Sequence, residues 1–134
     1  MNATAAPIRQ GLVVFAKDKA RVSAFYQRTL GLAVVECERT HDLLQGAGLE
    51  VVVHAIPKSA AKNIHISEPP QPREDTPFKP TFYVPDLDAV RTAVLATGGW
   101  LKAADKACHF RGATVLDGRH PEGNVVQFKQ PDAG

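Results

Sequence analysis

The sequence predicts an α+β fold made of two successive modules, each with one strand, one helix and three further strands. The main observation is an internal repeat: with an offset of 68 residues, Gly11–Asp18 aligns with Lys79–Asp86, and Gly31 aligns with Gly99. Each copy contains an extended apolar run, an aspartate, an amphipathic stretch, a glycine and a second extended run. Two such units can close one cleft between them, which is the usual place to look for a ligand.

The first module is expected over residues 11–56. Leu12–Lys17 has the alternation and β-branched content of a strand. Asp18 is a typical N-cap for a helix that runs to Leu30, and Gly31 is placed to end that helix in the left-handed conformation. The three following strands are predicted over Leu32–Cys37, His41–Gln45 and Leu49–Ile56.

A proline-rich connector is expected over residues 57–78. The stretch from Pro57 to Pro85 holds seven of the ten prolines, and Pro69–Pro72 excludes a helix or a central strand there. Asn63–Ile66 alternates enough for a short edge segment.

The second module is expected over residues 79–129. Asp86 caps a predicted helix that continues to Thr97, and Gly98–Gly99 ends it. The last three strands are predicted over Trp100–Ala104, Ala107–Asp117 and Asn124–Lys129, with a tight turn over residues 120–124.

Composition limits the classes of function. The chain has 134 residues, 44% apolar and 22% charged, which is ordinary for a single soluble domain. A net charge of +2 without a basic block gives no reason to expect a nucleic-acid partner. The apolar runs are only strand-length and the N-terminus lacks a signal-peptide core, so we expect no membrane association and a cytoplasmic location. Cys37 and Cys108 are expected to be free thiols.

Several of these segments resemble the vicinal oxygen chelate superfamily, which includes glyoxalase I, extradiol dioxygenases and the bleomycin and fosfomycin resistance proteins. The most specific segment is His120-Pro-Glu-Gly-Asn-Val-Val, which is similar to the D-P-x-G-N turn of that family with histidine in place of the first aspartate. The resemblance covers about Gly11 to Phe128. Its other segments are Lys17–Asp18, Phe25–Tyr26, Leu30–Gly31 and Asp86–Asp88.

The resemblance implies one domain in which two curved mixed sheets form a half-open barrel cleft, commonly within a homodimer. It also implies a divalent metal held by side chains from the first and last strands of each module. The corresponding positions here are Gly11, Val52, Lys79 and Gln127. Glycine and valine offer no donor, lysine is protonated near neutral pH, and an amide carbonyl alone is a weak ligand. We therefore expect no metal cofactor.

Strand alternation places Glu50 and His54 on the same face as Val52. His54 is suited to act as a general base or as a hydrogen-bonding group to a ligand, and it is equally compatible with a histidine at a strand end bonded to backbone. Glu50 and His54 are also the alternative metal-ligand pair. Glu50 and Lys79 either form an ion pair or leave Lys79 to attract an anionic ligand or act as a nucleophile.

Phe15 and Tyr83 occupy the same position in the two repeats, where they either stack on a planar ligand or simply fill the barrel. Arg111 is placed to bind a carboxylate or phosphate, although His109, Arg111, Arg119 and His120 together are more typical of a solvated strand edge and loop. The candidate ligand-binding residues are Phe15, Glu50, His54, Lys79, Tyr83, Arg111 and Gln127.

The sequence therefore predicts a metal-free protein that binds a small, partly aromatic, anionic organic molecule in its cleft. The alternative hypothesis is an enzyme, either a lyase, an isomerase or a dioxygenase-like member of the superfamily, that uses His54 or Glu50 as its base. No dinucleotide, phosphate-loop, G-x-S-x-G or C-x-x-C motif points to another class.

Overall fold

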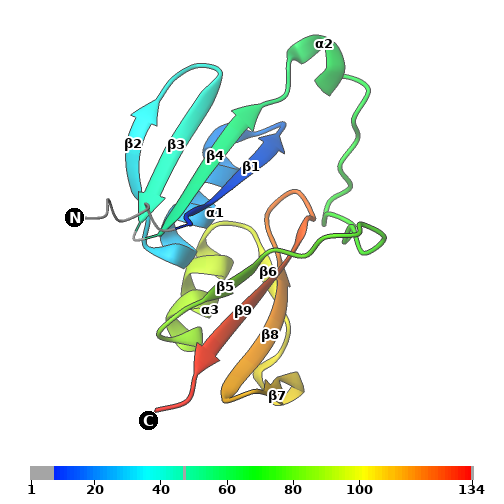
Figure 1. Ribbon diagram of the computed structural model, residues 1–134. Helices are drawn as coiled ribbons and strands as arrows, with labels where there is room; N and C mark the ends of the chain where they lie inside the picture. Colours follow the sequence, from blue (N-terminus) through cyan, green and yellow to red (C-terminus); the bar gives the residue numbers. More distant parts are fainter. Residues whose placement is uncertain (1–7, 47, 134) are drawn as a thin grey trace, which may run out of the picture.

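The computed structural model describes residues 8–46 and 48–133, and its first module has the predicted element order (Figure 1). The parallel pair β1–β4 and the antiparallel pairs β4–β3 and β3–β2 form a four-stranded sheet in the order β1-β4-β3-β2. Its elements are β1 (Gln10–Ala16), α1 (Lys19–Leu30), β2 (Ala33–Cys37), β3 (His41–Gly46) and β4 (Leu49–Ala55).

The second module repeats this plan with one change in its edge strand. Its sheet has the order β5-β9-β8-β6, and β7 pairs with the same strand β8, so that β6 and β7 together form one interrupted edge. A 3-10 turn, η1 (Ala104–Lys106), lies in the interruption. The other elements are β5 (Thr81–Tyr83), α3 (Leu87–Ala96), β6 (Trp100–Leu101), β7 (Cys108–Phe110), β8 (Ala113–Arg119) and β9 (Val125–Pro131).

Two of the predicted strands differ from those observed. The strand predicted over Ala107–Asp117 is a hairpin, because Arg111 and Gly112 have φ angles of 49° and 77° and reverse the chain between β7 and β8. Such positive φ values suit glycine and are uncommon for arginine. The strand predicted over Trp100–Ala104 ends at Leu101, where the edge strand is interrupted.

The connector contains a short helix that the sequence did not predict, α2 (Lys58–Ala61), directly after Pro57. Proline is well tolerated at the start of a helix, since it has no N–H to leave unpaired there. The predicted edge segment at Asn63–Ile66 is wrong, because these residues form a turn and an irregular stretch. An isolated bridge between Arg73 and Asn124 attaches the connector to the second module.

Both predicted helix starts are confirmed. The Asp18 carboxylate accepts a hydrogen bond from the Arg21 N–H at 3.1 Å, and the Asp86 carboxylate accepts one from the Asp88 N–H at 2.9 Å. Gly31 ends α1 with φ 64°, as a left-handed C-cap requires.

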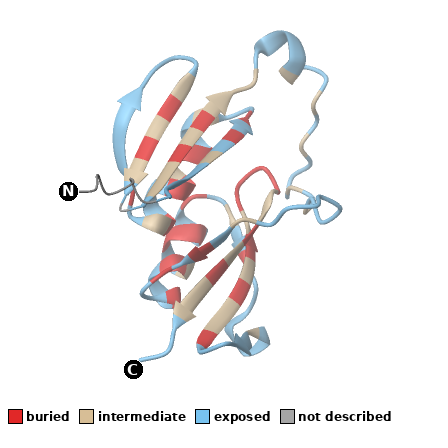
Figure 2. Ribbon diagram, viewed as in Figure 1, coloured by how far each residue is buried: buried red, intermediate tan, exposed pale blue. Residues whose placement is uncertain are grey.

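The helices lie on the inner sides of the two sheets and pack against each other where the modules meet (Figure 1). Phe25 and Tyr26 of α1 are fully buried, and their rings contact Phe128 and Phe82 of the second module. Buried and exposed positions alternate along the strands, which leaves the outer side of each sheet open (Figure 2). The core therefore lies between the two sheets, around α1 and α3.

A buried carboxylate fixes α1 to its own sheet. Asp42 of β3 accepts hydrogen bonds from Lys19 Nζ at 2.5 Å and from the Ser23 hydroxyl at 2.6 Å. Burial alone would raise the pKa of Asp42, but the bonds from Lys19 and Ser23 favour its charged form, and the net effect lowers this pKa.

The turn over residues 120–124 joins the two modules. Its Glu122 carboxylate accepts hydrogen bonds from the backbone N–H groups of Lys17 at 2.9 Å and of Asp18 at 2.7 Å, where α1 begins. A Cβ on Gly123 would lie 2.3 Å from the Gln71 carbonyl oxygen, so only glycine lets the connector approach this turn. These contacts bind the second module to both the first module and the connector.

His120 was expected in a solvated loop, and this expectation is wrong, because its side chain is only 2% exposed. Its ring lies edge-on to Phe25 and Tyr26, its Nδ1 accepts the Glu122 N–H at 3.0 Å, and its Nε2 contacts the Asn124 side-chain amide at 2.8 Å. Burial lowers the pKa of His120 to about 4, and the nearby Arg73 charge also disfavours the protonated form.

Within residues 8–46 and 48–133, no helix has both the length and the apolar character needed to cross a membrane.

We expect Glu122→Ala to lower the free energy of unfolding by about 3 kcal/mol, because the backbone N–H groups of Lys17 and Asp18 lose a charged acceptor in a partly buried place. Glu122→Gln keeps one oxygen acceptor, so its free energy of unfolding should fall by less. Urea unfolding measures the effect, with Glu74→Ala on the exposed connector as the control, which should change stability by less than about 0.5 kcal/mol. Equal losses in the Glu122→Ala and Glu74→Ala variants would contradict this account.

We expect His120 to make the protein sensitive to acid. Its folded pKa of about 4 lies below the value of about 6.5 for an unfolded chain, so the unfolded state binds more protons between these pH values. The neutral His120 ring makes its full contribution to the free energy of unfolding above pH 6.5. This contribution, about 3 kcal/mol in total, is lost as the pH falls from 6.5 toward 4. In His120→Asn, which keeps an acceptor near the Nδ1 position, the pH dependence of unfolding should be smaller by that amount. An unchanged pH profile would refute the assignment.

Candidate functional site

The predicted site residues lie on the open outer sides of the two sheets. Phe15, Glu50 and His54 lie on the outer side of the first sheet, which we call the N-terminal face. Lys79, Tyr83 and Gln127 lie on the outer side of the second sheet, which we call the C-terminal face. The two rings expected to face each other, Phe15 and Tyr83, are 60% and 69% exposed and belong to different sheets. One chain therefore does not bring these predicted residues together into one site.

His54 lies at one end of the N-terminal face, beside two other rings. Its Nδ1 bonds the Ala55 carbonyl oxygen at 2.8 Å, so this nitrogen carries the proton in the neutral ring and Nε2 keeps its lone pair. The ring stacks near His41, with centroids 6.4 Å apart, and is tilted against Phe15 at 5.6 Å. His41 in turn contacts the Glu36 carboxylate through Nε2 at 2.5 Å.

Glu50 lies at the other end of the same face and does not form the ion pair considered with Lys79. The Gln45 side chain donates a hydrogen bond to Glu50 at 3.0 Å. Lys79 instead pairs with the Asp117 carboxylate, with Nζ 3.0 Å from Oδ2. The two residues were expected close enough to form an ion pair, but they belong to separate modules, each with its own sheet. Glu50 and His54 are themselves four residues apart along one strand, roughly 13 Å, so they cannot share one small ion.

The chemistry of the four superfamily positions does not fit a divalent metal. Gly11 and Val52 have no donor, and Lys79 is a cation already paired with Asp117. The Gln127 amide donates to Asp117 at 3.1 Å, and its carbonyl oxygen accepts a hydrogen bond from Thr81 at 3.4 Å. In the part of the chain that the structure describes, no three His, Cys, Asp or Glu side chains are grouped to hold a metal.

The C-terminal face carries a cavity of about 310 Å³ beside the interrupted edge strand, which we call the lysine pocket. Lys102 and Lys106 enter it from the interruption around η1, and Lys129 enters it from β9. The Lys129 ammonium lies 5.3 Å from the centre of the Phe110 ring and 5.6 Å from that of Tyr83, within the range of cation–π attraction. Its full lining is Lys102, Lys106, Cys108, Phe110, Val115, Asp117, Gln127 and Lys129.

The charges in the lysine pocket are unevenly matched. Its one carboxylate, Asp117, is bonded through both oxygens, to Lys79 and to Gln127. The salt bridges among residues 8–46 and 48–133 give no carboxylate partner to Lys102, Lys106 or Lys129. The pocket therefore combines an aromatic wall with an excess of positive charge.

Arg111 lies apart from this pocket, at the exposed tip of the β7–β8 hairpin, and does not line it. Arg119, which was expected in a solvated edge, stacks over the Trp100 ring at 4.0 Å. Lys129 was expected within the last strand, but Lys102 and Lys106 were not among the candidate residues. Lys102 was expected inside the strand over Trp100–Ala104 and Lys106 in the gap before the next strand, whereas in the structure the first of these strands ends at Leu101 and η1 follows it. Two lysines four residues apart in that segment were the available signal.

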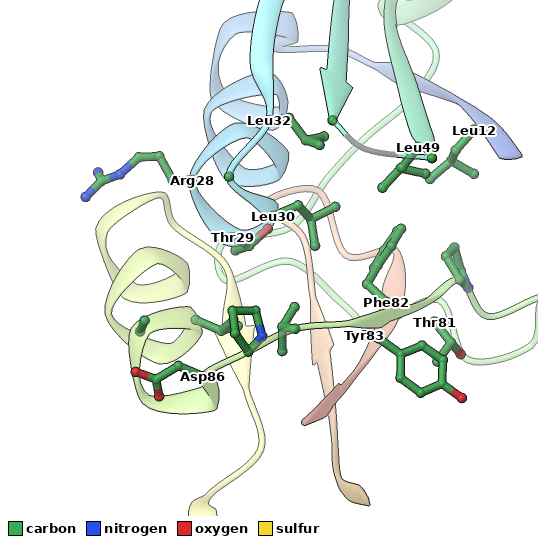
Figure 3. Close-up of a pocket in the computed structure, with 18 of the residues that line it drawn as sticks. Leu12, Arg28, Thr29, Leu30, Leu32, Leu49, Thr81, Phe82, Tyr83 and Asp86 are labelled. Atoms are coloured by element: carbon green, nitrogen blue, oxygen red, sulfur yellow. The ribbon is translucent and has the colours of Figure 1, made fainter. Parts of the chain in front are cut away.

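A second cavity, of about 470 Å³, lies in the groove between the modules (Figure 3). Phe82 points into this groove toward Leu12 and Leu49, while Tyr83 points to the other side of β5 (Figure 3). Its labelled charged side chains are Arg28 and Asp86, of which Asp86 caps α3. The described residues that line the groove include no arrangement of acid, base and nucleophile.

The sequence matches no protein-family model and no curated protein. Solved structures do match. A glyoxalase/bleomycin resistance protein/dioxygenase family enzyme from Burkholderia phytofirmans is 19% identical, with a TM-score of 0.65 over 90% of this chain and 96% of that one. A glyoxalase-related enzyme from Fulvimarina pelagi is 13% identical, with a TM-score of 0.64 over 92% and 87%.

A third match is a glyoxalase/bleomycin resistance protein from Albidiferax ferrireducens, 17% identical, with a TM-score of 0.61 over 90% of this chain and 95% of that one. At these identities the likeness is one of fold. The internal repeat, the two curved mixed sheets that do not close into a barrel, and these matches together give the chain the glyoxalase/bleomycin resistance/dioxygenase fold of the vicinal oxygen chelate superfamily.

Proposed function

We propose that the protein binds a small, partly aromatic, anionic organic molecule on its C-terminal face, without a metal and without chemical turnover. The observation that carries this proposal is the lysine pocket, in which three cations without a carboxylate partner among the described residues lie around an aromatic wall. Its volume of about 310 Å³ is at the lower end of the range of small-molecule sites. A ring against Phe110 and an anionic group near the lysines would satisfy both features.

The source of the anionic preference differs from the one expected. The charge of Lys79 is compensated by Asp117, and Arg111 lies at the hairpin tip. Lys129 takes their place in the proposal, with Lys102 and Lys106 as the supporting cations. Gln127 would orient the ligand, since it also lines the pocket.

We further propose that a second copy of the chain covers this face. The C-terminal face exposes Tyr83, Trp100 and Phe110, and the N-terminal face exposes Val13 and Phe15. Large exposed apolar groups gathered on one surface are typical of interaction sites. The N-terminal face carries the carboxylates Glu36 and Glu50, whereas the C-terminal face carries the excess of cations, so the two are complementary in charge.

In such a homodimer, Phe15 and His54 of one copy would complete the site on the C-terminal face of the other. This arrangement would restore the two-sided stacking that a single chain does not provide. We place this homodimer in the cytoplasm, where the exposed free thiols of Cys37 and Cys108 would remain reduced.

The enzyme alternative rests on His54, whose Nε2 keeps its lone pair on the open N-terminal face. A substrate bound between the faces could lose a proton to this nitrogen. Multiple turnovers that disappear in His54→Ala would establish this alternative in place of simple binding.

We expect Lys129→Ala to weaken binding of naphthalene-2,6-dicarboxylate by about tenfold, or 1.4 kcal/mol, because the dianion loses one of three cations. Binding of the neutral diamide of the same ring should be almost unchanged, and EDTA should affect neither. Fluorescence titration measures both ligands, and Lys62→Ala on the connector is the control. Equal losses for acid and diamide, or no binding of the acid by the unaltered protein, would rule out the lysine pocket as the anion site.

We expect the protein to sediment as a dimer at micromolar concentration, and Phe15→Glu to shift it toward the monomer, because a buried unpaired carboxylate opposes association. The matched control is Leu95→Glu, which alters an exposed leucine on α3, away from both faces. A monomeric unaltered protein would refute the proposal, as would equal dissociation of the two variants.

A further inference from the structure

A cavity of about 560 Å³ lies where β1, the connector and the turn over residues 120–124 meet, and we call it the junction pocket. In Figure 1 the connector passes along this side of the molecule, beside the loop between β8 and β9. The pocket shares no lining residue with the lysine pocket. Its lining is Leu12, Val13, Val14, Phe15, Tyr26, Ile56, Pro57, Ile64, Arg73, Thr76, Phe78, Pro80, Glu122, Asn124 and Val125.

Most of the polar groups in the junction pocket are already bonded within the protein. The Glu122 carboxylate binds the N–H groups of Lys17 and Asp18, and the Asn124 amide contacts His120. The Thr76 hydroxyl lies within hydrogen-bond distance of the carbonyl oxygens of Arg73 and Phe78. These groups form the wall of the pocket and have little remaining capacity to hydrogen-bond a ligand.

Two polar side chains that line the pocket, those of Tyr26 and Arg73, differ from these because they retain hydrogen-bonding capacity. Tyr26 is 1% exposed, yet among residues 8–46 and 48–133 its hydroxyl forms no hydrogen bond. Every fully enclosed side-chain nitrogen or oxygen in the described part of the chain has a partner, so the Tyr26 hydroxyl must reach accessible space, and the pocket that Tyr26 lines provides it. Burial raises the pKa of Tyr26, so the hydroxyl keeps its proton and can donate it in a hydrogen bond.

The second of these side chains is that of Arg73. Its backbone N–H donates to the Gly123 carbonyl at 2.9 Å, which holds the residue beside the turn. Its guanidinium forms no ion pair with a carboxylate in the described chain. Both residues are held beside the turn over residues 120–124, because the Arg73 N–H bonds Gly123 and the Tyr26 ring lies 6.0 Å from the His120 ring. Arg73 and Tyr26 therefore both line the pocket where it borders this turn.

We propose that the junction pocket binds an apolar monocarboxylic acid, with its carboxylate between Arg73 and Tyr26 and its apolar body against β1 and the connector. The rings of Phe15 and Phe78 and the side chains of Ile56 and Ile64 provide the apolar wall. One cation and one neutral donor match a single carboxylate, because the guanidinium supplies the charge and the hydroxyl bonds the second oxygen. A dianion would leave one charge unpaired among apolar side chains, so this site selects against dianions such as naphthalene-2,6-dicarboxylate.

The architecture explains why the pocket is formed at all. The connector is attached at both sides of it, through Lys17 Nζ to the Ile64 carbonyl and through Arg73 N–H to the Gly123 carbonyl. Between these two points the chain contains Pro69, Pro70 and Pro72, which restrict its backbone. None of residues 65–72 lines the pocket, so this restricted segment, bonded at its two ends, does not fill it.

The test is calorimetric titration of the full chain with decanoate and with 2-naphthoate, each paired with its neutral amide. We expect one site per chain for at least one of the two acids. Arg73→Gln should weaken binding of that acid at least tenfold and leave binding of its amide almost unchanged. Tyr26→Phe should weaken both acid and amide about fivefold, because the hydroxyl donates to an oxygen of either.

Two controls make the result specific. Lys62→Gln removes a connector cation outside the pocket, and Lys129→Ala removes one from the lysine pocket; neither should affect binding of decanoate, which has no ring to place against Phe110. Failure of both acids to bind the unaltered protein would overturn the proposal, as would equal loss of acid and amide in Arg73→Gln. Loss of decanoate binding in Lys129→Ala would show that the acids occupy the lysine pocket and would also overturn it. Melting scans of each variant confirm that it is folded.

Discussion

The contact between the Glu122 carboxylate and the N–H groups of Lys17 and Asp18 is the constraint on which the rest of the structure depends. Asp18 starts α1, so a group from the second module fixes the first turn of the central helix of the first. Phe25 and Tyr26, on that helix, then fill the space between the sheets. Without this contact the modules would still meet through α1, α3 and the rings of Phe25 and Tyr26, but the first turn of α1 would no longer be bonded to the second module.

The repeat, the caps and the face alternation were all predictable because they depend on local chemistry. Asp18, Gly31 and Asp86 act through neighbouring backbone groups, so their roles can be inferred from their own positions in the sequence. The β7–β8 hairpin was missed because it turns on Arg111 at a positive φ, a conformation that arginine rarely adopts. The burial of His120 was missed because a histidine between an arginine and a proline is typical of a surface turn.

The sequence could predict which side chains share one side of a strand, but not which side chains of the candidate site contact one another. Strand periodicity predicted that Glu50 and His54 share a face, and the repeat predicted equivalent positions for Phe15 and Tyr83. Both were expected around one cleft, whereas the structure puts these residues on the outer sides of two separate sheets. Strand periodicity could not show that Lys79 binds Asp117, since those residues are 38 positions apart and meet only through strand pairing. The lysine pocket likewise depends on an interruption of an edge strand, and tertiary packing decides where such an interruption falls.

The free edge of the first sheet illustrates a different consequence of this fold. All five residues of β2 are exposed, and a long, flat edge of this kind would pair with other chains and polymerise. The register shift between Val34 and Glu36 prevents this, because the bulged strand no longer offers an evenly spaced row of donors and acceptors. Glu36 adds a charge at the same place, next to Val35. The bulge therefore protects the β2 edge from pairing with other chains, while the apolar side chains of the open faces remain exposed.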